Sequence, residues 1–585
     1  MSISLNSYPA SSWRTNQRAG ADLIAAVCTS PSEIRIGVEA PCGSGKSLMA
    51  IRAAFSEFCP PCNILSTTRA HLRQYEQTLA EHYPDLEGKP DGWAILRGRS
   101  FYACCGGPAA RARAATELGG PEKDPEEEWV GGSKCPRGDN CLYKLAIKRC
   151  AQAKIVLQCT IGFLYRRRYW GSLDAPSAEA SEAQVDLAEA RQNIVSRELV
   201  ILDEAHEYLR VRREFELERM AFWPEMCTEG FRAQLLKART KGNYKCSYVL
   251  LEPDSPLRHA CEAEILRLLL PANLERLKPA KRMSDEEWAK AREGFADKLK
   301  ARLALFTIPS APPGEKEWPA PVLSLQFAES RRGSTCELVS EPLFARVGES
   351  LARVEVFMSA TLTQVARLLK IPEGHVKSFP EIFDWGASVA LSPLTDPDPD
   401  SRSNVAIGAD QLEAIYRVPG RPLTLVLFVS KAHAFKAVQG WGQRAPGLLV
   451  QGEGELSDLL DEARKWAQPS ACQDVSYATS LPDAPAPMVV TYGGWVGTDL
   501  PGAKWLVLGS APKTPISPHH EARQARGRIR SAWDDAEKNA LDRTQLAQGL
   551  GRALRSESDV CTLIWTNSRA FSDLGLDPST GRVQD

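Results

Sequence analysis

Residues 39–47 read EAPCGSGKS, a run of small residues that ends in lysine and serine. Alternating apolar side chains in residues 33–38 predict a short buried strand before it, and residues 48–54 predict a helix after it. Between a strand and a helix, such a loop can surround a phosphate with backbone N–H groups at the positive end of the helix. The stretch therefore predicts a nucleotide-binding loop, although Ala40 stands where the usual spacing has its first glycine.

The side chains of this loop suggest separate roles. We expect Lys46 to reach the β- and γ-phosphates of a nucleotide and the Ser47 hydroxyl to ligate Mg²⁺. The residues expected to wrap the phosphates are Gly43, Ser44 and Gly45. ATP and magnesium are thus the predicted cofactors.

A second motif follows about 155 residues later, where residues 199–206 read LVILDEAH. The apolar run predicts a strand that ends in two acids and a histidine. Asp203 is placed to hold Mg²⁺ and Glu204 to polarise an attacking water, which is how ATP hydrolysis divides the work. The alternative is a surface turn after a strand. Together the two motifs resemble the Walker A and DEAH motifs of superfamily 2 helicases.

Length and composition leave this function open. A chain of 585 residues is long enough for three or four domains. Its net charge of −1, from 72 basic and 73 acidic residues, gives no overall field for polyanions, so nucleic acid would need a local basic groove. The chain starts without a basic and apolar leader and has no apolar run near 18 residues, which predicts a soluble cytoplasmic protein without a membrane partner.

Two stretches resemble the iron–sulfur domain of XPD and DinG helicases: residues 96–105, LRGRSFYACC, and residues 135–146, CPRGDNCLYKLA. Four thiolates hold a [4Fe–4S] cluster, and the family supplies one early and three late cysteines. The candidate ligands here are Cys104, Cys105, Cys135 and Cys141. Because the late group is one short, Cys150 is another candidate, or the cluster is lost and the domain is vestigial.

Candidate nucleic-acid and base contacts are scattered along the chain. Arg14 and Gln17 lie on one helical face before the loop and could grip the adenine edge. By resemblance, Thr67 and Arg69 stand where helicases touch the DNA backbone, and Ser430 ends the predicted strand 423–430 as a further DNA candidate. Three arginines lie among aromatic residues in a mixture typical of single-strand binding, or of a solvated helix face: Arg166, Arg167 and Arg168.

The second half of the chain carries the remaining signatures. Residues 494–502 resemble a W-E-G-x-D-x-P-G motif in which Val496 replaces the acid and Asp499 remains as a candidate nucleotide contact. In the predicted helix 545–555, a spacing of three to four places an amide and two guanidinium groups on one face, as an arginine finger requires. These residues are Gln548, Arg552 and Arg555. Asn567 stands where the family commonly has an acid.

The resemblance implies an α/β fold with two RecA-like motor domains and two insertions in the first. Residues 207–306 are charged and helix-like without strand patterning, and the family has a helical arch there. The implied segments are motor domain 1 (1–103, 155–206 and 319–378), the iron–sulfur-type or vestigial domain (104–154), the arch (207–318) and motor domain 2 (379–585).

The function implied is that of an ATP-dependent DNA helicase, a monomeric motor that moves 5′ to 3′ on single-stranded DNA and unwinds tailed duplex. Two biological settings remain open. One is the DinG branch recruited by the RNA-guided complex of type IV CRISPR systems, and the other is a stand-alone DinG-like repair helicase of phage or bacterial origin. An ATP-gated DNA clamp without unwinding is an alternative of another class, suggested by Val496 and Asn567.

Overall fold

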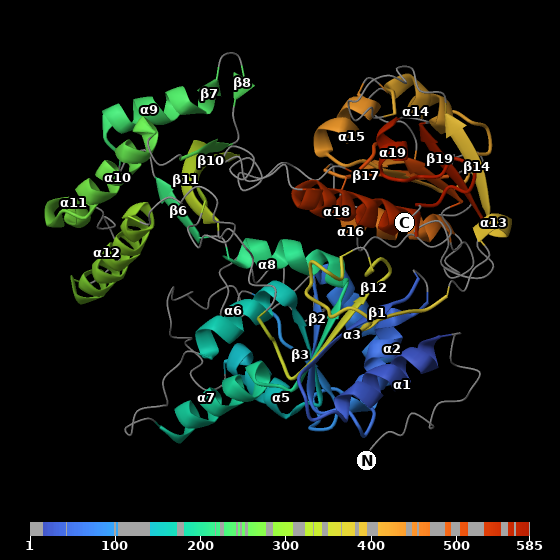
Figure 1. Cartoon of the computed structure of the whole chain (residues 1–585), viewed down its shortest axis with the longest axis horizontal. Coiled ribbons are helices and arrows are strands. Elements are labelled where there is room, and N and C mark those ends of the chain that lie inside the picture. The colour runs from blue at the N-terminus through green and yellow to red at the C-terminus, as the bar shows by residue number, and fades with distance from the viewer. Residues whose placement is uncertain are drawn as a thin grey trace, which may run out of the picture. The chain divides into compact units, whose positions relative to one another are not determined.

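The protein forms two compact units in a computed structural model (Figure 1). Unit 1 comprises Met1–Val211, Val347–Thr514 and Glu537–Asp585, and unit 2 comprises Arg212–Arg346 and Pro515–Ala536. The structure describes residues 16–41, 44–98, 101–102, 141–171, 181–216, 218–222, 227–241, 244–245, 248–251, 255–276, 285–307, 322–330, 333–341, 349–363, 365–380, 385–394, 407–439, 441, 447–452, 456–467, 486–492, 504–512, 532–551, 560–566 and 569–583.

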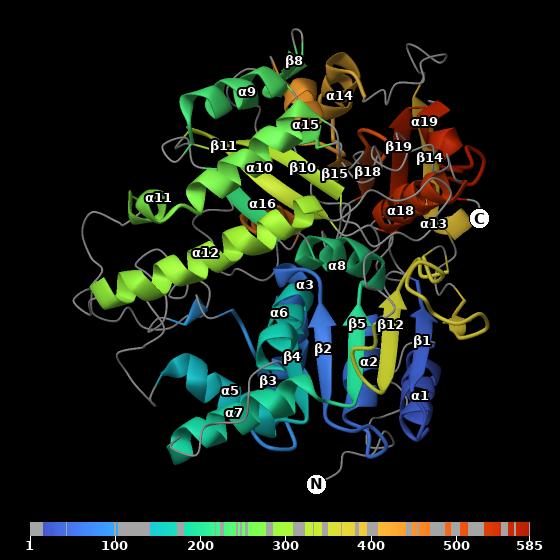
Figure 2. The ribbon, with the colours of Figure 1, turned by 60° about the vertical axis from the view of Figure 1, so that its left-hand side comes forward.

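Sheet 1 of unit 1 has seven strands, and every pairing between them is parallel. In spatial order they are β13 (Val376–Ser378), β1 (Ile34–Glu39), β12 (Val354–Ser359), β5 (Leu199–Asp203), β2 (Cys62–Ser66), β4 (Ile155–Cys159) and β3 (Trp93–Ile95). In Figure 2 the arrowheads of β1, β12, β5 and β2 lie at the same end. The loop after β1 and the acids that end β5 therefore reach one edge of the sheet.

Helices cover both faces of sheet 1, as the apolar strands of a parallel sheet require. They are α1 (Gln17–Cys28), α2 (Lys46–Ala54), α3 (Arg69–His82), α5 (Leu142–Gln152), α6 (Thr160–Trp170) and α7 (Glu182–Val195), with short turns η3 (Pro84–Leu86) and η6 (Ala205–Glu207). Helix α8 (Tyr208–Glu216) begins in unit 1 and ends in unit 2. Ile155 and Leu157 of β4 share a core with α1, α2 and α3, whereas Val156 between them packs with α5 and α7. Figure 1 shows these two groups of helices on opposite sides of the strands.

Sheet 2 of unit 1 has six strands, again all parallel. In spatial order they are β14 (Val389–Leu394), β19 (Cys561–Thr566), β18 (Trp505–Leu508), β15 (Thr424–Leu427), β17 (Met488–Thr491) and β16 (Leu448–Val450). The helices of this part are α13 (Trp385–Ser388), α14 (Ala409–Tyr416), α15 (Lys431–Val438), α16 (Leu456–Ala467), α19 (Arg569–Asp573) and, from Glu537 on, α18 (Ala532–Leu550). Two parallel α/β sheets confirm the expected fold class.

A buried arginine anchors the amino ends of the strands in each sheet. Arg197, before β5, donates to four main-chain carbonyls, those of Cys62, Cys150, Ala153 and Lys154, at 2.6–3.0 Å. Arg421, before β15, donates to the carbonyls of Tyr416, Pro422, Ala486 and Pro487 and to the Thr424 hydroxyl. Burial lowers the pKa of both guanidinium groups. Their hydrogen bonds hold separate strands in register where each sheet begins.

Unit 2 differs from the helical arch that we expected over 207–318. It contains an antiparallel sheet in the order β6 (Glu218–Phe222), β11 (Gly333–Glu341), β10 (Val322–Ser330) and β9 (Tyr248–Leu250), and a small hairpin of β7 (Thr240–Lys241) and β8 (Tyr244–Lys245). Its helices are α9 (Glu229–Arg239), α10 (Pro256–Leu268), α11 (Pro271–Arg276) and α12 (Asp285–Thr307).

The prediction that 207–306 lacks strands is therefore wrong, and residues 322–341, which we assigned to motor domain 1, belong to unit 2. Alternate residues Leu323 and Leu325 of β10 face the helices in one core with Leu299 of α12. The alternation of β10 was visible in the sequence. The outer pairings were not visible. Strand β9 pairs with β10 across 74–78 residues and β6 pairs with β11 across 114–122 residues, and such short, distant strands leave no local signal.

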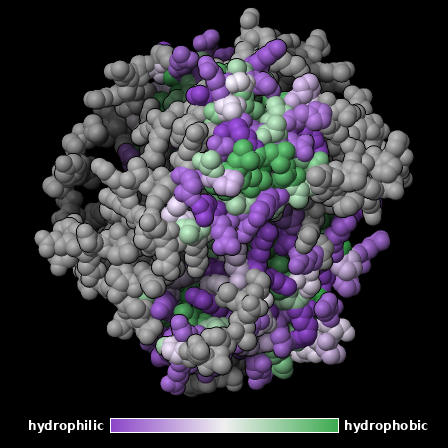
Figure 3. Space-filling view, turned by 90° about the vertical axis from the view of Figure 1, so that its left-hand side faces the viewer, coloured by the Kyte–Doolittle hydropathy of each residue, from purple (hydrophilic) through white to green (hydrophobic). Residues whose placement is uncertain are grey.

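In the described part of the chain, no helix is both long and apolar enough to span a bilayer. Most of the described surface in Figure 3 is hydrophilic, with a compact hydrophobic patch in the upper half of the view. Around α9 and α10 of unit 2, three leucines are exposed: Leu236, Leu266 and Leu270.

Candidate nucleotide site

Gln17, which the sequence suggested as a contact for adenine, supports the loop after β1. Gln17 of α1 is buried, and its Nε2 donates to the Ser44 carbonyl over 3.1 Å. Gly45 has φ +79°, and a Cβ placed on it would lie 1.9 Å from Gln17 Nε2. Glycine is therefore needed at this position for both backbone conformation and space. Gln17 supports the loop, rather than lying open beside it for an adenine base.

Lys46 opens α2 and lies over the same loop. Its Nζ donates to the carbonyl oxygens of Ala40 at 3.1 Å and Pro41 at 3.3 Å. The ammonium group is thus held at the amino end of a helix, whose backbone N–H groups also carry positive partial charge. This combination is suited to an anion such as a nucleotide phosphate.

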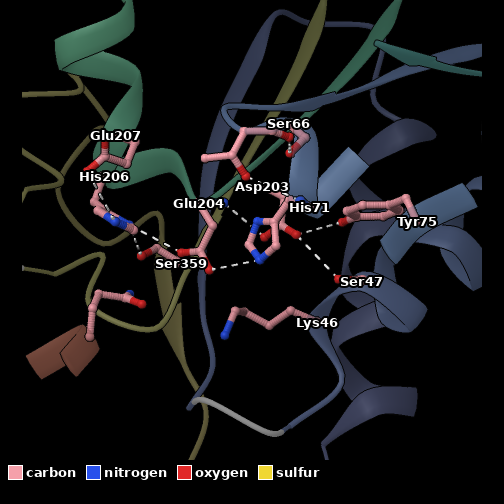
Figure 4. Close-up of polar contacts among 12 residues, drawn as sticks. Lys46, Ser47, Ser66, His71, Tyr75, Asp203, Glu204, His206, Glu207 and Ser359 are labelled. Carbon is pink, nitrogen blue, oxygen red and sulfur yellow. Dashed lines mark hydrogen bonds and ion pairs between the residues drawn. The ribbon is translucent and has the colours of Figure 1, made fainter. Parts of the chain in front are cut away.

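Both oxygens of the Asp203 carboxylate at the end of β5 have donors. Oδ1 accepts from the Glu204 backbone N–H at 2.9 Å. Oδ2 accepts from the Tyr75 hydroxyl at 2.9 Å and lies 3.4 Å from Ser47 Oγ (Figure 4). Burial, and then the neighbouring Asp203, raise the pKa of Tyr75 well above its usual range, so the phenol stays protonated and donates. The carboxylate is held facing Ser47, so the two residues that the sequence suggested as magnesium ligands lie next to each other.

Glu204 adopts a backbone conformation that is rare for a residue with a side chain, with φ 51° and ψ 48°. The turn closes through a hydrogen bond from the Glu207 N–H to the Glu204 carbonyl, at 2.9 Å. Left-handed geometry costs on the order of 1–3 kcal/mol and persists where the surroundings enforce it, often at functional sites. This conformation occurs at the first residue after β5, directly beside Asp203.

Two histidines flank the Glu204 carboxylate (Figure 4). His71 Nε2 of α3 lies 3.6 Å from Oε1, and His206 Nδ1 lies 3.4 Å from Oε2. Burial lowers the pKa of His206 and outweighs the opposing effect of Glu204, which favours a neutral ring at this position. The acid therefore sits between two imidazoles near the loop rather than in open solvent.

A chain of polar contacts continues from His206. Its Nδ1 lies 2.9 Å from Ser359 Oγ at the end of β12, and Ser359 Oγ lies 3.5 Å from Thr361 Oγ1. Thr361 Oγ1 in turn accepts from Gln548 Nε2 of α18 at 3.4 Å. These contacts link the acid after β5 to Ser359 and Thr361 at the end of β12, and through them to Gln548, the first residue of the predicted arginine face.

The donor set fits a magnesium ion bound with a nucleotide. Mg²⁺ prefers oxygen ligands and usually combines one or two protein groups with phosphate oxygens and water. Ser47 Oγ and Asp203 Oδ2 are such oxygens, 3.4 Å apart, at the start of α2 and at the end of β5. Ser47 and Asp203 are therefore the residues able to hold the ion beside phosphates on the loop.

The arginine run of α6 does not present one face. Arg166 is buried and donates to Gln158 Oε1 and the Arg97 carbonyl, and Arg167 donates to the carbonyls of Ser350 and Leu351. Arg168 is exposed. Neighbouring residues on a helix point about 100° apart, so three consecutive arginines cannot share a surface. Arg166 and Arg167 hold the fold together.

The other predicted DNA residues in the described part lie where strands meet helices. Thr67 follows β2, and Arg69 begins α3. Ser430 caps α15 by accepting the His433 N–H at 3.2 Å. Thr68, between Thr67 and Arg69, caps α3 in the same way. Each lies just beyond the carboxyl end of a central strand, at the same edge as the site in the case of sheet 1.

Several predicted residues lie outside the described residues: Arg14, Gly43, Cys104, Cys105, Cys135, Asp499, Arg552 and Arg555. Two cysteines of the predicted cluster region are described. Cys141 precedes α5 and is buried, and Cys150 is fully buried in a core with Ile147, where burial raises its thiol pKa to about 12. Among the described residues, no group of three or more cysteine, histidine or acidic side chains could hold a metal ion.

Sequence reasoning missed two residues at the site, His71 and Tyr75. Both lie on α3, four residues apart, and so project from one side of the helix. Neither belongs to a recognised pattern in the sequence. Their i, i+4 spacing after a hydroxyl-capped start was a signal that two side chains share a face, but only the fold shows what they face.

Comparison with known proteins agrees with this architecture. No protein-family model matches the chain, and no curated protein matches it. Solved structures do. An XPD helicase structure covers 96% of this chain and 96% of its own, with a TM-score of 0.55 and 15% identity. An apo XPD structure covers 95% and 96%, with a TM-score of 0.51 and 14% identity. S. tokodaii Xpd4 covers 98% and 100%, with a TM-score of 0.51 and 13% identity. The chain has the fold of these helicases.

Proposed function

We propose that this chain is an ATP-dependent DNA helicase that moves along single-stranded DNA and separates the duplex ahead of it. The observation that carries the proposal is the edge of sheet 1, where Lys46, Asp203 and Glu204 meet and His206 begins a polar chain toward α18. Such a site joins hydrolysis to a second sheet, as a motor requires. Movement from 5′ to 3′ is proposed from the resemblance to XPD and DinG helicases.

The residues of sheet 1 divide the chemistry. Lys46 and the loop amides bind the β- and γ-phosphates of ATP, and Ser47 and Asp203 are the residues that would hold Mg²⁺. When bound, the ion neutralises charge that develops on the phosphates during transfer. Glu204, which lies between His71 and His206, orients the attacking water and accepts its proton.

Sheet 2 and its helices supply the other half of the proposed cycle. Gln548, Arg552 and Arg555 would contact the γ-phosphate when ATP brings the two sheets together, and Asp499 would contact the nucleotide as well. Planar guanidinium groups stabilise the charge of the transferring phosphoryl. The contact between Gln548 and Thr361 supports a link from this helix to the hydrolytic acids.

For DNA, we propose backbone contacts from Thr67, Arg69 and Ser430, which follow strands β2 and β15. On α6, Arg168 is the arginine exposed for this purpose. Beside it, Tyr165 and Tyr169 are exposed and stacked on each other at 6.2 Å between ring centres. Exposed aromatic rings next to a basic residue suit bases of a single strand.

The deciding experiment measures ATP hydrolysis and strand separation together. We expect hydrolysis by the full chain to rise with single-stranded DNA, and a duplex with a 5′ tail to separate while a 3′-tailed duplex does not. Glu204→Gln is the control for contaminating enzymes. DNA-stimulated hydrolysis without separation of either duplex would favour the clamp, and hydrolysis indifferent to DNA would reject both.

We further propose that residues 104–154 bind a [4Fe–4S] cluster through Cys104, Cys135 and Cys141, with Cys105 or Cys150 as the fourth ligand. The burial of Cys150 in an apolar core favours Cys105 over it. Iron and acid-labile sulfide analysis of anaerobically purified protein tests this. About four irons per chain are expected for such a cluster, and iron-free protein that hydrolyses ATP would identify a vestigial domain.

The biological setting is proposed from sequence departures alone. Val496 and Asn567 replace acids of the family pattern, and the late cysteine group is one short, which favours the DinG branch recruited by a type IV CRISPR RNA-guided complex. A stand-alone repair helicase is the other setting. Strand separation that depends on an added RNA-guided complex would support recruitment, whereas full activity of the monomer by itself would support the stand-alone role.

A further inference from the structure

Helix α3 contributes two side chains to the acids at the end of β5 that no motif accounts for. Tyr75 is fully buried, and its hydroxyl lies 2.9 Å from Asp203 Oδ2. His71, one turn earlier, lies 3.6 Å from Glu204 Oε1. Thus each acid has one partner from the same helix, on the side that faces the loop (Figure 4).

The Tyr75 contact is the shorter of two hydroxyl contacts to Asp203 Oδ2. The Ser47 hydroxyl lies 3.4 Å from that oxygen, beyond the usual range of about 2.5–3.0 Å for hydroxyl donors, whereas Tyr75 lies within it. Since the Glu204 N–H bonds Oδ1, Tyr75 completes a grip on both carboxylate oxygens. The orientation of Asp203 toward Ser47 is thereby fixed without any ion.

We propose that Tyr75 and His71 are positioning residues: Tyr75 holds Asp203 in the orientation that accepts a divalent cation, and His71 holds Glu204 in the orientation that activates water. This inference rests on the proposed function for the identity of the reaction. It assigns separate consequences to the two residues. Tyr75 governs how tightly the cation binds with nucleotide, and His71 governs the rate of hydrolysis.

A binding experiment tests the proposed role of Tyr75 without relying on hydrolysis. A fluorescent ADP analogue is titrated into the full chain without Mg²⁺, and then at increasing Mg²⁺, for the wild type and for Tyr75→Phe. Loss of partners that orient a metal ligand typically weakens metal affinity by about 10- to 100-fold. We expect the Mg²⁺ midpoint to rise about 10-fold or more in Tyr75→Phe, with Mg²⁺-free binding unchanged.

Tyr83→Phe is the matched control. Tyr83 directly follows α3, is buried, and packs on Phe55 with ring centres 4.5 Å apart, so its loss also removes a buried phenol oxygen. Its eight-residue separation from Tyr75 corresponds to about 12 Å along a helix. The Mg²⁺ midpoint of Tyr83→Phe should match the wild type. Equal shifts in both variants, no shift in Tyr75→Phe, or loss of its Mg²⁺-free binding would each overturn the assignment.

A double variant gives an independent check. In Asp203→Asn the charged acceptor is gone, so adding Tyr75→Phe should change the Mg²⁺ midpoint little further. Fully additive effects of the two substitutions would mean that Tyr75 acts elsewhere, and would reject its positioning role.

The proposed role of His71 is tested by measuring steady-state ATP hydrolysis. His71→Ala should lower kcat about 10-fold or more, in the range of other orienting partners, while the KM for ATP and the Mg²⁺ midpoint stay near the wild-type values. His433→Ala is the control, because His433 holds the same place after the capped start of α15. A change in KM or Mg²⁺ midpoint without a fall in kcat contradicts the proposed role.

The two proposals can fail separately. If the Mg²⁺ midpoint rises in Tyr75→Phe as predicted but the wild-type chain separates no duplex, the helicase function is overturned and the Tyr75 assignment stands. A chain that unwinds DNA while Tyr75→Phe keeps the wild-type Mg²⁺ midpoint overturns only the Tyr75 assignment.

Discussion

Sheet 1 and sheet 2 are built alike where their strands begin. Each has a buried arginine before a central strand, Arg197 in sheet 1 and Arg421 in sheet 2, and each guanidinium binds carbonyls from several chain segments. The pKa of each is lowered by burial, and each stays paired with main-chain acceptors. At the amino ends of their strands the two sheets thus share the same kind of contact, a buried arginine that stabilises the fold by binding main-chain carbonyls.

The sheets differ where their strands end. After β2 of sheet 1, Thr68 caps α3, and His71 and Tyr75 reach the acids of β5. After β15 of sheet 2, Ser430 caps α15, His433 follows at the same spacing, and Ala437 takes the place of the tyrosine. The two sheets therefore share a scaffold, while the side chains that build the candidate nucleotide site lie at one edge of sheet 1 alone, among the described residues.

The largest effect on ATP hydrolysis should come from replacing Glu204, the acid that directly follows β5 in sheet 1. Glu204→Gln keeps the shape of the side chain but cannot accept a proton, so DNA-stimulated phosphate release should fall by about 10²-fold or more, with ATP binding retained. Glu198→Gln is the control, since Glu198 directly precedes β5 and its exposed carboxylate pairs with Arg353. Wild-type turnover in Glu204→Gln would place the chemistry elsewhere.

The next largest effect should come from the loss of Arg197 or Arg421, the buried arginines at the amino ends of the strands in the two sheets. In Arg197→Ala or Arg421→Ala, buried carbonyls lose their donors, each worth roughly 1–3 kcal/mol, so the free energy of unfolding should fall by about 3 kcal/mol or more. Hydrogen exchange should report it locally, in β2 and β4 for the first variant and in β17 for the second. Arg18→Ala, which removes an exposed ion pair with Asp22, should change little. Exchange that rises equally throughout both sheets in either variant contradicts the sheet-specific role.

A smaller effect is expected from the nucleotide loop. Gly45→Ala introduces a Cβ 1.9 Å from Gln17 Nε2 at φ +79°, whereas Gly374→Ala has the same φ and nothing within 4 Å. Left-handed strain alone costs about 1–2 kcal/mol for alanine. Gly45→Ala should therefore lower nucleotide affinity as well as thermal stability, and Gly374→Ala should lower stability alone. Equal nucleotide affinities in the two variants would show that the Gln17 contact is unimportant.

The smallest effect comes from two buried serines near the carboxyl ends of strands, Ser359 at the end of β12 and Ser510 two residues after β18. Ser359 Oγ contacts His206 in sheet 1, and Ser510 Oγ accepts the Val429 N–H in sheet 2. Each alanine variant should lose about 1 kcal/mol of stability with its hydrogen bond. Only Ser359→Ala should also weaken the stimulation of ATP hydrolysis by DNA, as measured by the ratio of stimulated to basal rates. If Ser510→Ala lowers that ratio equally, the polar chain through Ser359 is not the coupling route.

The site in sheet 1 was largely predictable because its motifs are local. The glycine-rich loop and the acids after an apolar strand are each contained in fewer than ten residues, and parallel strands bring their carboxyl ends together. The contacts of His71, Tyr75 and Gln17 were not predictable, because each depends on a helix meeting a segment distant in sequence. Charge runs misled for a related reason: Arg166 belongs to the core and Arg168 to the surface, although they are two residues apart.

The place of β1 in sheet 1 also sets the order in which the protein is assembled during synthesis. Among the described strands, β1 pairs with β12 and β13, and the paired residues Arg35 and Glu355 are separated by 320 positions. At about 5–20 residues per second, a ribosome needs roughly 16 to 64 s to cover that distance. The strand that carries the predicted nucleotide loop is made before the other described strands but pairs late, so a nascent chain already contains Asp203 and Glu204 while β1 still lacks both of its neighbours in the sheet.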